Sequence, residues 1–413
     1  MAIPSELVSE QERARAARKG IICPCCSSPA TSPLYRVPSI PIHSCILLRS
    51  AADALAFPRR DLELTYCQSC GFAFNHIFDE GEMRYSVDFE ESQHFSGTFN
   101  DFAKNLAREV AQRCSIANKH VLEIGCGKGE FLSELCRVGG ASGTGIDPGY
   151  RNDMGRTPAG QDVDFIVDEF GPKYSYLEAD VILCRHTLEH IAPVAKFIQS
   201  IREMIGTRRD TCLVFETPDF KRVIEEGAFW DIYYEHCSYF SAGTHARLFR
   251  QEGFDVIGLS LVYDNQYIVQ YAIPADTGAS VPLPLEQDLD AMHVLASRFA
   301  SRVMESQEYW RDLIRSAWND GKRIVLWGGG SKGVSFLTTL GLSEEVAAVV
   351  DVNPYKQGRF MPGTGHPVIA PKQLIDEQPD LVVVMNPIYK REIIGGLDEL
   401  GLAPDVVALE REG

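Results

Sequence analysis

The chain has 413 residues, more than one hydrophobic core usually supports, so we expect two or three domains. Its formal net charge of −17 argues against nucleic acid as a partner, because binding to a polyanion depends on Lys and Arg. No uninterrupted apolar run approaches the roughly 18 residues of a membrane span, and residues 1–20 are charged and lack the apolar centre of a secretion signal. We therefore expect a cytoplasmic protein, in which the 12 cysteines bind metal or are buried.

Two C-x-x-C pairs near the N-terminus predict a structural zinc site. The pairs are Cys23 with Cys26 and Cys67 with Cys70. Four thiolates close the tetrahedral shell of a zinc ion, which leaves no position for a substrate. Cys25 could replace Cys23 or Cys26, and the residues alone do not decide between them. We expect an N-terminal module, residues 1–80, in which the zinc serves as a scaffold.

A strand, a glycine-rich turn and a helix follow between residues 119 and 139. The turn places Gly125, Gly127 and Gly129 at alternate positions after Glu123, and the next strand ends on Asp147. This order predicts the nucleotide-binding half of a doubly wound sheet, in which the glycines let a ligand lie against the backbone and the carboxylate accepts from a ribose. The spacing E-x-G-x-G-x-G resembles motif I of the class I S-adenosyl-L-methionine (SAM) methyltransferases. The resemblance implies that these five residues bind SAM.

A third strand is predicted within residues 163–170, and its tip carries Asp168 and Glu169. In folds of the class that motif I indicates, a carboxylate at this strand end commonly faces the adenine amino group. On that resemblance we expect Asp168 to contact the cofactor.

A fourth strand over residues 181–184 runs into the segment His186-Thr-Leu-Glu189-His190. The spacing H-x-x-E-H also occurs in zinc proteases, but that site needs both histidines within one helix, whereas His186 is expected at the strand end. The segment resembles instead the sequence that borders the SAM sulfonium in class I methyltransferases. The resemblance implies that Arg185 or His186 lines the cofactor site.

Residues 233–241, just before a helix predicted over residues 244–252, are dense in titratable and aromatic side chains. Tyr233 and Glu235 flank His236 there. A histidine beside a carboxylate suits proton abstraction, because the carboxylate fixes the tautomer and raises the basicity of the ring. The alternative is a packed aromatic loop, and the residues alone favour neither reading.

The whole chain resembles the zinc-containing sugar C-methyltransferases that act on nucleotide-linked 4-keto-6-deoxysugars. That family joins an N-terminal module with C-x-x-C pairs, a SAM domain and a C-terminal Rossmann-like domain, and its Y-x-E-H-x-x-Y-F-S motif stands here at residues 233–241. The resemblance implies that His236 removes the proton alpha to the ketone and that Tyr233 and Glu235 lie beside it. Tyr239 is expected at the substrate, and Tyr233 or Tyr239 would donate to the enolate oxygen.

A second glycine turn follows a Pro- and Gly-rich linker, residues 274–285, and a long helix predicted over residues 286–319. This turn, residues 328–333, reads G-x-G-x-x-G, and Asp351 ends the next strand, so by itself it predicts NAD. The family resemblance places it instead on the sugar-nucleotide side. Backbone amides near Gly330 and the ammonium of Lys332 would then meet a diphosphate.

We therefore expect an α/β protein with three parts: the zinc module, a class I SAM methyltransferase domain over residues 81–275, and a Rossmann-like substrate domain over residues 286–413. The expected activity is methylation of the carbon next to a sugar ketone, with SAM as the donor and a nucleotide sugar as the partner. Three alternatives stay open: methylation of O, N or a non-sugar carbon, an NAD-dependent oxidoreductase, and a non-catalytic scaffold. The sequence does not predict the oligomeric state.

Overall fold

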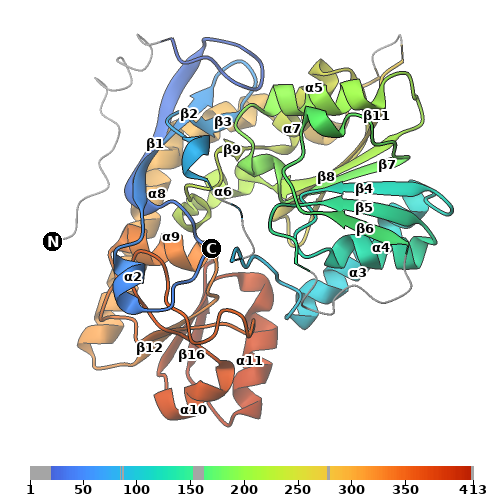
Figure 1. The fold of residues 1–413 in the computed structure, drawn as a ribbon. Coiled ribbons are helices and arrows are strands. Elements are labelled where there is room, and N and C mark those ends of the chain that lie inside the picture. The colour runs from blue at the N-terminus through green and yellow to red at the C-terminus, as the bar shows by residue number, and fades with distance from the viewer. Residues whose placement is uncertain (1–19, 84, 86–87, 152–161, 277–279, 411–413) are drawn as a thin grey trace.

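The computed structural model describes residues 20–83, 85, 88–151, 162–276 and 280–410. Over these ranges the chain forms three β-sheets, each built from its own part of the sequence except for one short strand (Figure 1).

The N-terminal module is an antiparallel sheet that begins with a long hairpin. Strands β1 (Thr31–Pro41) and β2 (Arg59–Cys67) pair from Thr31 opposite Cys67 to Pro41 opposite Arg59, and α2 (Ala51–Leu55) lies in their connection. Strand β3 (Ala73–Asn75) pairs antiparallel with β2. The hairpin between the two cysteine pairs brings the pairs together, because they flank its open end.

The fourth strand of this sheet comes from far along the chain. Strand β9 (Ser238–Tyr239) pairs with β3, and Ala73 stands opposite Tyr239. The segment that the sequence singled out around His236 is therefore fixed to the N-terminal module.

The second sheet has seven strands in the order β10-β11-β8-β7-β4-β5-β6. Its strands are β4 (His120–Ile124), β5 (Ser142–Ile146), β6 (Val163–Ile166), β7 (Val181–Arg185), β8 (Cys212–Pro218), β10 (Phe254–Val262) and β11 (Tyr267–Pro274). Strand β11 runs antiparallel to both neighbours, and the pairings from β8 through β7, β4 and β5 to β6 are parallel. The carboxyl ends of β4, β5 and β7 therefore meet at one edge, where such sheets bind ligands.

The helices of this part are α3 (Gly97–Arg113), α4 (Glu130–Gly139), α5 (Val194–Ile205), α6 (Phe220–Glu226) and α7 (Ala242–Gln251). Every residue of β7 is buried, as expected for a central strand that is covered on both faces.

The C-terminal domain has a five-stranded parallel sheet in the order β14-β13-β12-β15-β16. Its strands are β12 (Ile324–Trp327), β13 (Ala348–Val350), β14 (Val368–Ile369), β15 (Leu381–Val384) and β16 (Asp405–Ala408). Its helices are α8 (Leu289–Asn319), α9 (Ser331–Leu340), α10 (Leu374–Glu377) and α11 (Lys390–Glu399).

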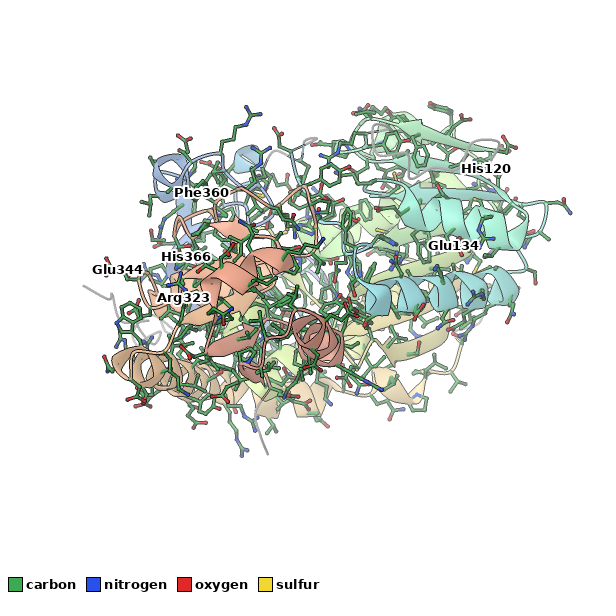
Figure 2. The ribbon with its side chains drawn as sticks, turned by 90° about the horizontal axis from the view of Figure 1, so that it is seen from below. His120, Glu134, Arg323, Glu344, Phe360 and His366 are labelled. Atoms are coloured by element: carbon green, nitrogen blue, oxygen red, sulfur yellow. The ribbon has the colours of Figure 1, made fainter. Side chains whose placement is uncertain are left out.

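The N-terminal module and the C-terminal domain share one hydrophobic core. Leu62 of β2, Trp230, Trp310 of α8 and Phe336 of α9 belong to the same buried cluster. Figure 2 shows the C-terminal domain, with Arg323 and Phe360 labelled, beside the domain of the seven-stranded sheet. None of the helices in the part of the chain that the structure describes combines the length and apolar character of a bilayer span.

Candidate active site

A cavity of about 1190 Å³ connects the two glycine turns. It opens over the carboxyl ends of β4, β5 and β7 and extends to the turn before α9. Its lining includes the first turn at Gly125, the imidazole of His236, and the second turn at Gly330, together with Cys45 from the N-terminal module. All three parts of the chain therefore contribute to one site.

The first turn has the backbone that the glycine spacing predicts. Gly125, Gly127 and Gly129 have φ angles of 72°, 54° and 79°, in the left-handed region that favours glycine. Asp147, at the end of β5, accepts from the amides of Gly127 at 2.9 Å and Gly149 at 2.6 Å. The carboxylate thus holds the turn and lines the cavity.

The part of the cavity near the first glycine turn lies beside buried charges of both signs. Arg185 donates to Glu216 at 2.5 Å, and His186 Nε2 lies 3.2 Å from the other oxygen of that carboxylate. Burial lowers the pKa of His186, but the Glu216 and Glu189 carboxylates outweigh it and raise the pKa to about 9. Burial also raises the pKa of Glu123 to about 7. His186 has a φ of 49°, a strained conformation of the kind found at functional sites.

The expectation for Asp168 needs a correction. Its carboxylate accepts from the Tyr174 hydroxyl at 2.6 Å and pairs with Lys173 at 2.5 Å. Glu169 rather than Asp168 lines the cavity. The two carboxylates are adjacent in the sequence, and the direction of the backbone after β6 decides between them.

His236 lies in the cavity with Tyr233 beside it. The Tyr233 hydroxyl is 3.1 Å from His236 Nε2, and the two rings are 4.1 Å apart. Burial is the main reason that the pKa of His236 is well below its ordinary value. The ring is therefore neutral near pH 7, which is the form that accepts a proton.

Glu235 does not contact His236, in contrast to the expected arrangement. Its carboxylate accepts from His43 Nδ1 at 2.9 Å, from the Ser44 amide at 3.0 Å and from the Ser44 hydroxyl. Residues 234 and 235 form a turn in which the His236 amide donates to the Tyr233 carbonyl at 3.2 Å, so the side chains of Glu235 and His236 take different directions. Glu235 therefore ties residues 233–241 to the N-terminal module.

Sequence reasoning missed the groups that do surround His236. Glu189 Oε1 lies 4.0 Å from His236 Nε2, and the rings of His190 and His236 are 4.8 Å apart. The Tyr85 hydroxyl is 2.9 Å from His190 Nδ1. Glu189 and His190 belong to the same H-x-x-E-H segment as His186. From that region, however, only Arg185 and His186 were expected at the site.

Tyr239 does not line the cavity, although a substrate contact was expected. It lies in β9, it is buried, and its hydroxyl donates to the Tyr233 carbonyl at 3.4 Å. Tyr239 therefore supports Tyr233, and Tyr233 alone of the two lines the cavity.

At the second turn, Gly330 and Lys332 both line the cavity. The Lys332 ammonium, however, is 3.1 Å from Asp231, which also binds Arg222. A second cation that the sequence did not indicate, Lys356, is buried at the same end of the cavity, 3.6 Å from Asp351.

The four cysteines of the two C-x-x-C pairs converge. The Sγ atoms of Cys23 and Cys70 are 3.8 Å apart and those of Cys26 and Cys67 are 3.6 Å apart. A tetrahedral ion with bonds of about 2.3 Å needs sulfurs about 3.8 Å apart, so these residues fit zinc. Cys25 does not belong to the group of four.

The site thus combines a glycine turn for a nucleoside-containing cofactor with a neutral histidine in the same cavity. Residues 94–259 match the family described as "Methyltransferase domain", and residues 285–401 match the family described as "C-methyltransferase C-terminal domain". The chain is therefore a SAM-dependent methyltransferase. Among methyltransferases, residues 285–401 are similar to the C-terminal domain of C-methyltransferases.

Among its relatives, C-methyltransferase NovU of Streptomyces niveus is 27% identical over 351 residues, which cover 81% of this chain and 82% of that protein. Ubiquinone biosynthesis O-methyltransferase of Pseudomonas putida is 32% identical over 102 residues, 23% of this chain and 44% of that protein. The solved 1,6-didemethyltoxoflavin-N1-methyltransferase of Burkholderia thailandensis, which holds S-adenosylhomocysteine, has a TM-score of 0.34 and 17% identity over 44% of this chain and 82% of that one.

Proposed function

We propose that the protein methylates the carbon next to the ketone of a nucleotide-linked 4-keto-deoxysugar. The observation that carries this proposal is the shared cavity, which His236 lines together with the glycine turn after β4 and the glycine turn of the C-terminal domain. A donor at the first turn and a nucleotide diphosphate near the second would leave the sugar at the imidazole.

SAM supplies the methyl group when it is bound. The ketone acidifies the neighbouring C–H, and Nε2 of His236 takes that proton. The enolate carbon forms the new C–C bond as the methyl group leaves the sulfur. The Tyr233 hydroxyl, now 3.1 Å from Nε2, would turn to the enolate oxygen when substrate takes its place. A hydrogen-bond donor at that oxygen stabilises the negative charge that develops in the transition state.

The diphosphate would bind at the second turn, where two lysines line the cavity. Lys356 is the stronger candidate, because its ammonium lies 3.6 Å from Asp351, whereas that of Lys332 is held more closely, 3.1 Å from Asp231. Since a charged hydrogen bond contributes about 1.5–3 kcal/mol, Lys356→Met should raise KM for the nucleotide sugar about 10- to 100-fold, with SAM affinity unchanged. Steady-state kinetics with both substrates measures this, and the exposed Lys372→Met is the control. An unchanged KM in Lys356→Met would remove this residue from the substrate site.

We also propose that Cys23, Cys26, Cys67 and Cys70 hold a structural zinc ion. Cys67→Ser should lose the ion and lower the melting temperature. The activity should fall as well, because Arg247 and Thr244 of α7 donate to the Cys70 carbonyl, and β3 pairs with β9. Cys25→Ser should retain the metal. Elemental analysis decides the point, and a Cys67→Ser protein with a full zinc content would refute the assignment.

The NAD alternative has less support. Asp351 accepts from the Gly329 amide at 2.8 Å, just as Asp147 accepts from the Gly127 amide at the first turn, so this pairing does not distinguish NAD from a nucleotide sugar. The match of residues 285–401 to the family described as "C-methyltransferase C-terminal domain" favours the nucleotide sugar.

The function is tested by mass spectrometry of SAM incubations with a panel of nucleotide 4-ketosugars. A product heavier by one methylene from at least one ketosugar supports the proposal. Methylation of other acceptors but no ketosugar would contradict it, as would stabilisation by NAD and not by SAM.

A further inference from the structure

Three side chains with potential metal-binding atoms converge in the cavity, and His236 is one of them. Glu189, His190 and His236 each offer one donor atom, and these atoms lie within 4.8 Å of one another. All three residues line the cavity. Two imidazole nitrogens and one carboxylate oxygen suit divalent ions such as Zn²⁺ and Co²⁺.

The carboxylate in this group lacks the partners that burial requires. Glu189 is 2% exposed, and neither of its oxygens accepts a hydrogen bond from the described residues. His186 Nδ1 lies 3.6 Å and His236 Nε2 4.0 Å from its Oε1, beyond hydrogen-bond distance. A buried carboxylate without hydrogen bonds is unfavourable, and a cation bound at its oxygen would relieve this.

The histidines are oriented as metal ligands usually are. The Tyr85 hydroxyl bonds to His190 Nδ1 at 2.9 Å, which fixes the ring and leaves Nε2 for another partner. Such an outer hydrogen bond commonly sets the orientation of a ligating imidazole. His236 directs Nε2 toward Glu189, and the Tyr233 hydroxyl at 3.1 Å is the group that an ion would displace.

We propose that Glu189, His190 and His236 bind a divalent transition-metal ion, and that this ion inhibits methyl transfer. It would occupy the Nε2 lone pair through which His236 takes the substrate proton, so bound metal and proton abstraction exclude each other. The inhibition rests on the proposed function, whereas the binding does not. This donor set differs from the H-x-x-E-H pair, because His186 is not part of it.

Binding is tested with Co²⁺ on the full chain whose four-cysteine site already holds zinc. We expect one additional equivalent, seen by its visible ligand-field absorbance without a thiolate band. Loss of even a ligand's outer partner weakens metal affinity about 10- to 100-fold, so Glu189→Gln and His190→Gln should each weaken Co²⁺ binding at least tenfold. His120→Gln, at the edge of the domain in Figure 2, is the matched control and should bind as the parent does.

Inhibition is tested on the parent protein with Zn²⁺ and with Mg²⁺, which prefers oxygen ligands. Saturating Zn²⁺ should lower turnover at least tenfold, reversibly with a chelator too weak to strip four thiolates, and Mg²⁺ should not. Turnover with no additional Co²⁺ bound, or equal binding in Glu189→Gln, would overturn the metal site and leave the proposed function standing. Metal binding in a protein that methylates no ketosugar would support the site and overturn the proposed function.

Discussion

His236→Asn should lower kcat by about 10²- to 10⁴-fold, the usual contribution of a general base, and leave the affinity for SAM nearly unchanged. Asparagine fills much of the same space but cannot take a proton at Nε2. The imidazole is also the group that faces Tyr233 and Glu189 across the cavity. Single-turnover kinetics measures the methyl transfer, and calorimetry measures SAM binding.

A second readout separates proton abstraction from a structural effect. The parent protein, incubated with ketosugar in D₂O without a reactive methyl donor, should exchange the proton alpha to the ketone, and His236→Asn should not. His293→Asn, whose ring bonds to the Gln68 carbonyl far along the chain, is the matched control. Full turnover by His236→Asn would remove this residue from the mechanism.

Gly125→Ala should weaken SAM binding about 30- to 100-fold, since strain of about 2–3 kcal/mol is expected from a non-glycine residue at this position. The new Cβ would overlap the Thr187 side chain, and the φ angle of 72° disfavours any residue but glycine. The Thr187 hydroxyl cannot move freely, because it donates to the Arg185 carbonyl at 3.0 Å. Calorimetry with SAM measures the loss.

Gly140→Ala is the control that separates the effect of backbone strain on SAM binding from the effect of the Cβ overlap with Thr187. Gly140 has a φ of 65°, close to that of Gly125, but a Cβ there would meet nothing within 4 Å, and the residue does not line the cavity. This variant should be less stable and still bind SAM normally. Equal SAM binding by Gly125→Ala and the parent would contradict the placement of the cofactor at this turn.

The local elements could be predicted from the sequence because their signals are local. The glycine turn after β4, the carboxylate that ends β5 and the long helix before β12 follow from spacing and periodicity within short windows. The pairing of β9 with β3 could not be predicted in this way. It joins residues more than 160 positions apart, and a two-residue strand carries no periodicity. The limits of the three predicted domains remain predictions. Strand β9 belongs by sequence to the predicted domain 81–275 but pairs with β3 of the predicted module 1–80.

At the site, the residue types were easier to predict than the directions in which their side chains point. His236 and Tyr233 lie together in the cavity, as the motif indicated. Tyr239 belongs to the same motif but does not line the cavity, because β9 is held by β3. Glu235 lines the cavity, but its carboxylate is bound by His43 and Ser44 and not by His236. Glu189 lies near His236 only because two segments that are distant in the sequence pack together. No rule based on residue spacing predicts such a contact.

The most direct test of the account is ¹³C NMR of a product made from SAM labelled with ¹³C in its methyl group and a ketosugar labelled with ¹³C in the sugar. If the protein forms a carbon–carbon bond next to the ketone, the methyl signal is split by coupling to the labelled sugar carbon. An unsplit methyl signal, at the shift of a methyl group on oxygen or nitrogen, would contradict the account.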